Sequence, residues 1–175
     1  AWNQYGDLIQ NSVTKGYEIA GTVKETDFMT KSPTKIVDKD GKELKVFKEF
    51  QYETPTFKQI NPNFTVALIS AEDERFYDHH GVDLYGTLRG IASTLQGNGV
   101  QGGSTITQQL VRNVILESSE VTVERKLIEQ VVSQEVEKQM SKDEIVRHYL
   151  NNVYFGNGNY GIAPASSSYL SKDQK

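Results

Sequence analysis

Apolar residues recur at helical spacing along most of the chain from residue 61 onward. Asn61 can cap a helix and Pro62 suits a first helical position, so a helix is predicted to begin there and to carry Glu72 at its end. Its apolar face comprises Phe64, Ala67, Leu68 and Ala71. Further helices are predicted over 83–96 and 104–115, after Thr122 as far as Met140, and after Ser141, where Glu144 completes a capping box. The chain is therefore predicted to be mainly α-helical.

The first third of the chain has a different pattern. Residues 1–34 are polar with only short apolar groups, and we expect them to be an N-terminal approach segment that is partly helical. Over 35–50, apolar and polar residues alternate on both sides of Asp40-Gly41, which is typical of a β-hairpin. A small hairpin is thus predicted ahead of the helices.

The composition narrows the class of protein. The 175 residues, 37% hydrophobic and 24% charged, suffice for one globular domain with a sizeable core. A net charge of -4 argues against a nucleic-acid partner, because binding a phosphate backbone needs an excess of Lys and Arg. Without cysteine there are no disulfides and no thiolate metal ligands. The longest aliphatic run, 66–69, is too short to cross a bilayer and residues 1–20 do not resemble a signal peptide, so the chain as given is expected to be soluble.

Two glutamates on separate predicted helices are the best candidates for acid–base chemistry. Glu72 and Asp73 end an apolar helix, so at least one of these carboxylates is expected in a partly desolvated position, as suits a general base. A solvated helix end is the simpler alternative. Glu129 follows Arg125 by four residues and Lys126 by three, so all three share one helix surface. For this group the simpler alternative is an exposed ladder of ion pairs.

The turn over residues 102–105, GGST, precedes a predicted helix and is a candidate anion site, because glycines let backbone N–H groups approach a ligand. It has neither the Walker lysine spacing nor a dinucleotide fingerprint, and the alternative is a flexible turn with Ser104 as the helix cap. Gln108, Gln109 and Arg112 extend the polar surface of that helix, although such residues are usually only solvated.

Residue types that bind metals gather at Asp78, His79, His80 and Asp83. Adjacent histidines in one loop point in different directions and His148 is remote in sequence, so a hydrogen-bonded histidine that holds the loop is favoured over a metal site. No serine belongs to a recognisable hydrolase motif, and a Ser-His-Asp triad therefore has no support.

In order and content these blocks resemble the peptidoglycan glycosyltransferase domain of class A penicillin-binding proteins and monofunctional glycosyltransferases. The resemblance runs from about Lys35 to the C-terminus, and the family's second motif is present unchanged as GGSTITQQ over residues 102–109. Arg112 stands where a lysine is common. The residues that fit the first, third and fourth motifs are Glu72, Asp73, Phe76, His79, Gly81 and Asp83, then Arg125, Lys126 and Glu129, then Lys142, Ile145, Tyr149, Leu150 and Asn151.

The resemblance implies a lysozyme-like helical fold and inverting transfer of a growing glycan strand from a polyprenyl pyrophosphate to lipid II. Glu72 would be the general base, and Glu129 would act on the pyrophosphate side with Arg125 and Lys126, directly or through a divalent cation such as Mg or Mn. No organic cofactor is implied. The implied substrate-binding residues are Asp73, Phe76, His79, Ser104, Thr105, Gln108, Gln109, Arg112, Arg125, Lys126, Tyr149 and Asn151.

The resemblance also implies partners and a location. The partners would be lipid II, the growing lipid-linked strand, the membrane surface, a following transpeptidase domain and cell-wall synthesis proteins. Moenomycin, a phosphoglycolipid that mimics the donor in this family, would be an inhibitor. The location would be the outer face of the bacterial cytoplasmic membrane, with a transmembrane anchor outside this chain. The stripe Leu84, Leu88, Ile91 and Leu95, with glycines at 81, 86, 90, 97 and 99, would be a mobile membrane-contacting face, whereas its pattern alone predicts buried core.

We divide the chain into an approach segment, 1–34, and a glycosyltransferase domain, 35–175, in which we expect the family's last apolar helices to be missing. Two other functions stay open. One is a lysozyme-like glycoside hydrolase that cuts the same polymer, and the other is a truncated domain that binds the lipid-linked donor without turnover.

Overall fold

The computed structural model describes residues 2–30, 35–46, 54–95, 102–118 and 120–170. Within these ranges there are seven α-helices and one two-stranded antiparallel sheet, which confirms the prediction of a mainly α-helical fold with a small hairpin. The helices are α1 (Trp2–Ala20), α2 (Pro62–Glu72), α3 (Leu84–Leu95), α4 (Ile106–Val111), α5 (Val123–Gln139), α6 (Lys142–Asn152) and α7 (Ile162–Leu170), and the strands are β1 (Lys35–Val37) and β2 (Glu43–Val46).

Local capping signals place three helix starts where the sequence predicts them. The Asn61 side chain accepts the backbone N–H of Asn63 ahead of α2, and Thr122 accepts that of Arg125 ahead of α5. Ser141 and Glu144 form the predicted capping box of α6. The hydrogen bonds from Ser141 lower the pKa of Glu144, because they favour its charged form.

The third predicted helix differs from its prediction at both ends. Thr105, not Ser104, is the N-cap of α4, and its hydroxyl accepts the backbone N–H of Gln108. After Val111 the chain continues as a π-helical stretch, Arg112–Leu116, which ends at Glu117 in the left-handed conformation with φ 43°. Apolar periodicity cannot distinguish this wider turn from a regular helix, and π-helical turns are frequent at functional sites.

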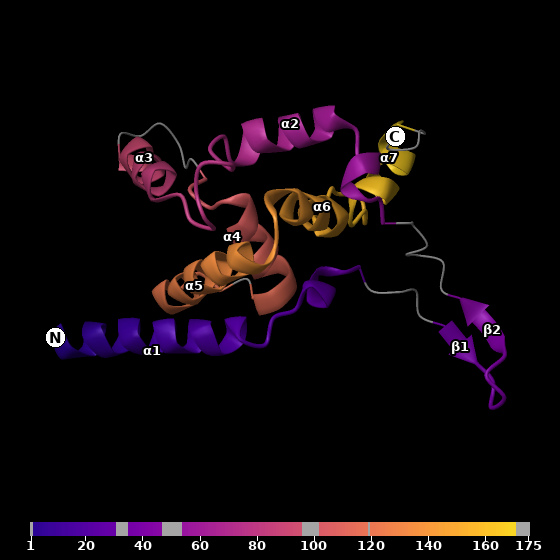
Figure 1. Cartoon of the computed structure of the whole chain (residues 1–175), viewed down its shortest axis with the longest axis horizontal. Helices are drawn as coiled ribbons and strands as arrows, with labels where there is room; N and C mark the ends of the chain where they lie inside the picture. The colour runs from indigo at the N-terminus through magenta and orange to yellow at the C-terminus, as the bar shows by residue number, and fades with distance from the viewer. Residues whose placement is uncertain (1, 31–34, 47–53, 96–101, 119, 171–175) are drawn as a thin grey trace.

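The hairpin forms as predicted, with its turn at residues 38–42. The Asp38 carboxylate accepts the N–H groups of Asp40 and Lys42, and Gly41 takes a φ of +80°. Figure 1 shows the two strands at one end of the molecule, away from the helices. Ile36 and Leu44 are accordingly exposed, so the hairpin adds little to the core.

Residues 2–20 form one continuous helix, α1, which is more ordered than the partly helical approach segment expected from the sequence. Figure 1 shows α1 lying alongside α5. Small residues four apart, Ser12, Gly16 and Ala20, are buried on α1. A Cβ added at Gly16 would stand 2.8 Å from the Cβ of Val131 on α5, so this glycine allows the two helices to approach closely.

The core lies among α4, α5 and α6, with Phe28 and Phe76 brought in from the connecting segments. His148 is buried in it, and its Nδ1 lies 3.0 Å from the carbonyl oxygen of Phe28. Because a carbonyl only accepts, Nδ1 carries the proton. Burial and then the positive charge of Arg147 lower the pKa of His148, against the opposing effect of Glu25.

Ala20, Val23 and Phe28 belong to the same core cluster, so residues ahead of position 35 pack with the helical body. The division of the chain at residue 34 stays a prediction. Among the helices of the described ranges, none combines the length and the apolar character needed to cross a membrane.

Candidate active site

Glu72 is the exposed carboxylate at the end of α2, and Asp73 beside it is the buried one. The Glu72 Oε2 accepts a hydrogen bond of 3.0 Å from the Nε2 of Gln109 on α4. The Oε1 of Gln109 accepts one of 3.0 Å from the hydroxyl of Tyr149 on α6. Three helices far apart in sequence therefore meet at this carboxylate.

Asp73 joins the end of α2 to the start of α4. Both of its oxygens lie 3.0 Å from the Nε2 of His79, and its Oδ2 also accepts the backbone N–H of Ile106 at 3.0 Å. Asp73 and His79 are each only 7% exposed. The predicted hydrogen-bonded histidine that holds this loop is thus confirmed, and it also fixes the backbone next to Glu72.

Glu129 is fully buried on α5, so the alternative of an exposed ion-pair ladder is wrong for this residue. Its Oε2 lies 2.5 Å from Nη1 of Arg125, and its Oε1 pairs with the ammonium of Lys126. The Ser133 hydroxyl donates to the backbone carbonyl of Glu129 at 2.7 Å. One carboxylate between two cations leaves this group with a net positive charge.

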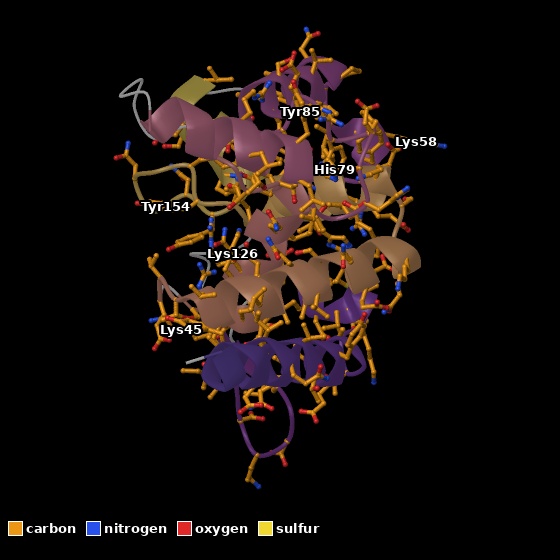
Figure 2. All side chains as sticks on the ribbon, turned by 90° about the vertical axis from the view of Figure 1, so that its left-hand side faces the viewer. Lys45, Lys58, His79, Tyr85, Lys126 and Tyr154 are labelled. Carbon is orange, nitrogen blue, oxygen red and sulfur yellow. The ribbon has the colours of Figure 1, made fainter. Side chains whose placement is uncertain are left out.

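Lys126 links that cationic group to the segment that carries Gln109. Its Nζ donates to the hydroxyl of Ser104 at 2.9 Å, just ahead of α4. Figure 2 shows Lys126 on the side of α5 that faces away from α1. Ser104 and Gln109 are five residues apart, so Glu72 and Lys126 both contact the short segment 104–109.

The predicted site residues separate by burial into two sets. An accessible set reaches solvent at least in part and can contact a ligand: Glu72, Ser104, Gln109, Arg112, Arg125 and Lys126. A buried set supports them: Asp73, Phe76, His79, Thr105, Gln108, Glu129, Tyr149 and Asn151. Substrate contact by members of the buried set stays a prediction.

Three members of the buried set hydrogen-bond to other protein groups: Thr105, Gln108 and Asn151. Thr105 and Gln108 form the capping box of α4, and the Thr105 hydroxyl also donates to the carbonyl of Gly81 at 2.7 Å. Asn151 donates to the carbonyl of Pro55 at 3.1 Å. Burial and then the negative charge of Glu72 raise the pKa of Tyr149 to about 12, although Arg112 acts in the opposite direction.

At the start of α4, where an anion site is predicted, three backbone N–H groups already have internal acceptors. That of Thr105 donates to the side chain of Gln108. That of Ile106 donates to Asp73, and that of Gln108 donates to Thr105. An anion would have to displace these internal acceptors. The positive charge available to an anion comes instead from Arg125 and Lys126.

One polar cluster beneath the site was missed by the sequence analysis. The Thr107 hydroxyl donates to Oε1 of Glu137 at 2.5 Å, and Lys142 lies 2.7 Å from Oε2 of the same carboxylate. The Lys142 ammonium also lies 4.3 Å from the ring centroid of Phe76. The cluster joins α4, α5, α6 and the loop after α2, and the sequence gives no local signal that these residues meet.

The donor set does not fit a cation held by the protein. Both oxygens of Glu129 are engaged by basic side chains, and Asp73 is engaged by His79 and Ile106. Across the described ranges no group of three or more His, Cys, Asp or Glu is placed to bind a metal. A divalent cation on the pyrophosphate side therefore stays a prediction.

An apolar surface lies on α3. Leu84, Tyr85 and Leu88 are 69%, 63% and 67% exposed, so the prediction of buried core from pattern alone is wrong for Leu84 and Leu88. The side chains of Ile91 and Leu95 and the glycines at 97 and 99 lie outside what the structure describes. Gly86 packs closely, because a Cβ there would stand 2.5 Å from the Asp83 carboxylate.

Comparison with known families agrees with this geometry. A family model described as Transglycosylase matches residues 40–175, which include every residue of the site. The chain belongs to the transglycosylase family. The resemblance noted in the sequence is thereby confirmed.

Relatives of this transglycosylase chain include the monofunctional glycosyltransferases of Staphylococcus aureus strains JH9 and Newman. Each is 50% identical to it over 104 residues, which are 59% of this chain and 38% of the relative. The chain thus spans well under half the length of the curated relatives it matches.

Proposed function

We propose that this domain is a peptidoglycan glycosyltransferase that polymerises lipid II into β-1,4-linked glycan strands. One observation carries the proposal: the exposed carboxylate of Glu72 and the ammonium of Lys126 both contact the segment 104–109, and Glu129 holds Arg125 beside Lys126. A base on one side and positive charge on the other are what transfer from a pyrophosphate donor requires.

In the proposed reaction Glu72 takes the proton of the acceptor 4-hydroxyl. The acceptor oxygen attacks the anomeric carbon of the donor, the bond from that carbon to the pyrophosphate oxygen breaks, and its electron pair leaves with the pyrophosphate. The α-linked centre inverts to a β link. The Gln109 hydrogen bond holds the carboxylate of Glu72 in place for this step.

Charge on the departing pyrophosphate is stabilised by Arg125 and Lys126, which are only partly buried. Glu129 is fully buried and occupied by these two side chains, so it acts by holding them and does not touch the substrate. Pyrophosphate leaves as an anion, so no carboxylic acid is needed to protonate it. This differs from glycosidases, in which one carboxyl group protonates the leaving oxygen.

The exposed α3 surface supports a location on a membrane. Leu84, Tyr85 and Leu88 place apolar side chains on one short helix at more than half exposure, an arrangement suited to contact with a lipid surface. We propose that α3 rests on the bilayer, so that the polyprenyl tails of donor and acceptor stay in the lipid during transfer.

The test is Glu72→Gln in the intact protein, supplied with lipid II in vesicles. Loss of general-base catalysis is expected to lower glycan synthesis by at least about 100-fold, while circular dichroism and thermal unfolding stay close to those of the wild type. Near-normal polymerisation by this variant would show that Glu72 is not the general base.

The products of the same assay separate the other functions. A hydrolase acting on purified glycan strands would release new reducing ends and would need no lipid-linked donor. A binding domain without turnover would retain lipid II on vesicles but leave it unconverted over hours. Either outcome with the wild-type protein contradicts the proposed polymerase.

A further inference from the structure

We propose that Tyr149 is a positioning residue for the base: its hydroxyl fixes the amide of Gln109 so that the amide nitrogen faces Glu72. The inference rests on the proposed function, because it assigns a role within that reaction. It replaces direct substrate binding by Tyr149 with an action through Gln109.

The contacts form a chain with a defined direction. The Tyr149 hydroxyl donates to Oε1 of Gln109 at 3.0 Å, and Nε2 of Gln109 donates to Oε2 of Glu72 at 3.0 Å. Tyr149 is 5% exposed, Gln109 is half-buried and Glu72 is exposed. The chain therefore runs outward from the core to the carboxylate that meets solvent.

The orientation of the Gln109 amide decides whether it helps or opposes a charged carboxylate. With Nε2 toward Glu72 the amide donates a hydrogen bond, whereas after a flip its Oε1 would face the carboxylate and repel it. The charge of Glu72 already favours the first orientation. The Tyr149 hydroxyl, a donor at the Oε1 end, strengthens that preference and holds the amide where it meets Glu72.

Tyr149 remains such a donor at any pH at which the enzyme works. Burial and the nearby charge of Glu72 raise its pKa to about 12, so the hydroxyl keeps its proton. Arg112 is the cation that opposes this shift. The hydroxyl is also too buried to exchange its partner freely with solvent, which keeps its direction fixed.

The backbone near these three side chains is already fixed by other contacts. What Tyr149 restricts is therefore the orientation of the Gln109 side chain. Asp73, next to Glu72, accepts the N–H of Ile106 at 3.0 Å and so ties the end of α2 to the start of α4. Gln109 lies within α4, and Tyr149 lies within α6. With the helices fixed, the hydroxyl selects one amide orientation.

The experiment measures lipid II polymerisation by the intact Tyr149→Phe protein in vesicles. Loss of one hydrogen bond is expected to lower kcat about three- to tenfold. KM should change by less than about twofold, because the lost group does not touch substrate. Tyr169→Phe is the control variant. It removes an exposed hydrogen bond from the hydroxyl of Tyr169 on α7 to the carbonyl oxygen of Phe155, neither of which is a predicted site residue, and it should leave kcat unchanged.

The same substitution made in a Gln109→Ala protein shows whether Tyr149 acts through Gln109. If it does, Tyr149→Phe lowers kcat in the wild type but has no further effect in Gln109→Ala, because the amide that it orients is gone. Equal losses of kcat in both backgrounds, or a loss confined to KM, would overturn the proposal.

Glu72→Gln, run in parallel, separates this inference from the proposed function. An inactive Glu72→Gln together with wild-type kcat for Tyr149→Phe refutes only the positioning role. An active Glu72→Gln refutes the base assignment itself, whatever Tyr149→Phe does.

Discussion

Replacing Gly81 by alanine tests the close contact between the loop after α2 and helix α5. Gly81 has a φ of +82°, and a Cβ there would stand 2.7 Å from the backbone carbon and oxygen of Ser133. These are backbone atoms of a helix, so they cannot rotate away as a side chain would. The substitution must therefore strain the loop, the helix or both.

Two terms set the expected magnitude. A non-glycine residue in the left-handed conformation costs about 1–2 kcal/mol, and forcing an extra carbon into a packed site costs about 1–3 kcal/mol. Gly81→Ala should thus lower the free energy of unfolding by about 2–5 kcal/mol. Gly158 isolates the first term, because it has a φ of +76° and nothing within 4 Å of an added Cβ.

The assay is urea unfolding of both variants, followed by far-UV circular dichroism and compared at equal m-values. Gly81→Ala should be less stable than Gly158→Ala by the packing term of about 1–3 kcal/mol. It should also lose activity, because the Gly81 carbonyl accepts from Thr105, which caps α4. Equal stability losses in the two variants would show that the contact with Ser133 is not tight and would refute the reasoning.

Three further outcomes are expected. Lys126→Ala should weaken moenomycin binding, measured by fluorescence anisotropy, by at least about tenfold and should affect thermal stability less. Unchanged affinity would show that Lys126 does not bind the anion. Leu84→Ser with Leu88→Ser should reduce vesicle binding in a flotation assay yet change the free energy of unfolding by less than about 0.5 kcal/mol per site, and unfolding would instead mark them as core. Burial lowers the folded-state pKa of His148 below the usual 6.5, so protons favour the unfolded chain. Stability should therefore be independent of this group above that value and be lost as pH falls below it; His148→Gln should flatten this dependence in unfolding curves between pH 7.5 and 5, and an unchanged slope would contradict it.

The sequence by itself determined the features that depend on near neighbours. Asn61 with Pro62, Thr122, and Ser141 with Glu144 cap their helices through side chains two or three residues from the N–H groups that they bind. The turn at Gly41 is local in the same sense. Such contacts form within one turn of the chain, so the order of residues is enough to predict them. The motif blocks are also short stretches of sequence, so the family could be recognised from sequence alone.

The tertiary structure alone decided which charged residues are buried and which helices meet. The spacing in the sequence predicts that Glu129 lies beside Arg125 and Lys126 on one helix. Only the packing of α5 against the other helices buries the Glu129 carboxylate. Helix α1 docks through Ser12, Gly16 and Ala20, small residues that a hydrophobic pattern does not register because close approach depends on the shape of the partner. The chain from Tyr149 through Gln109 to Glu72 joins three helices, and no local rule relates residues so far apart.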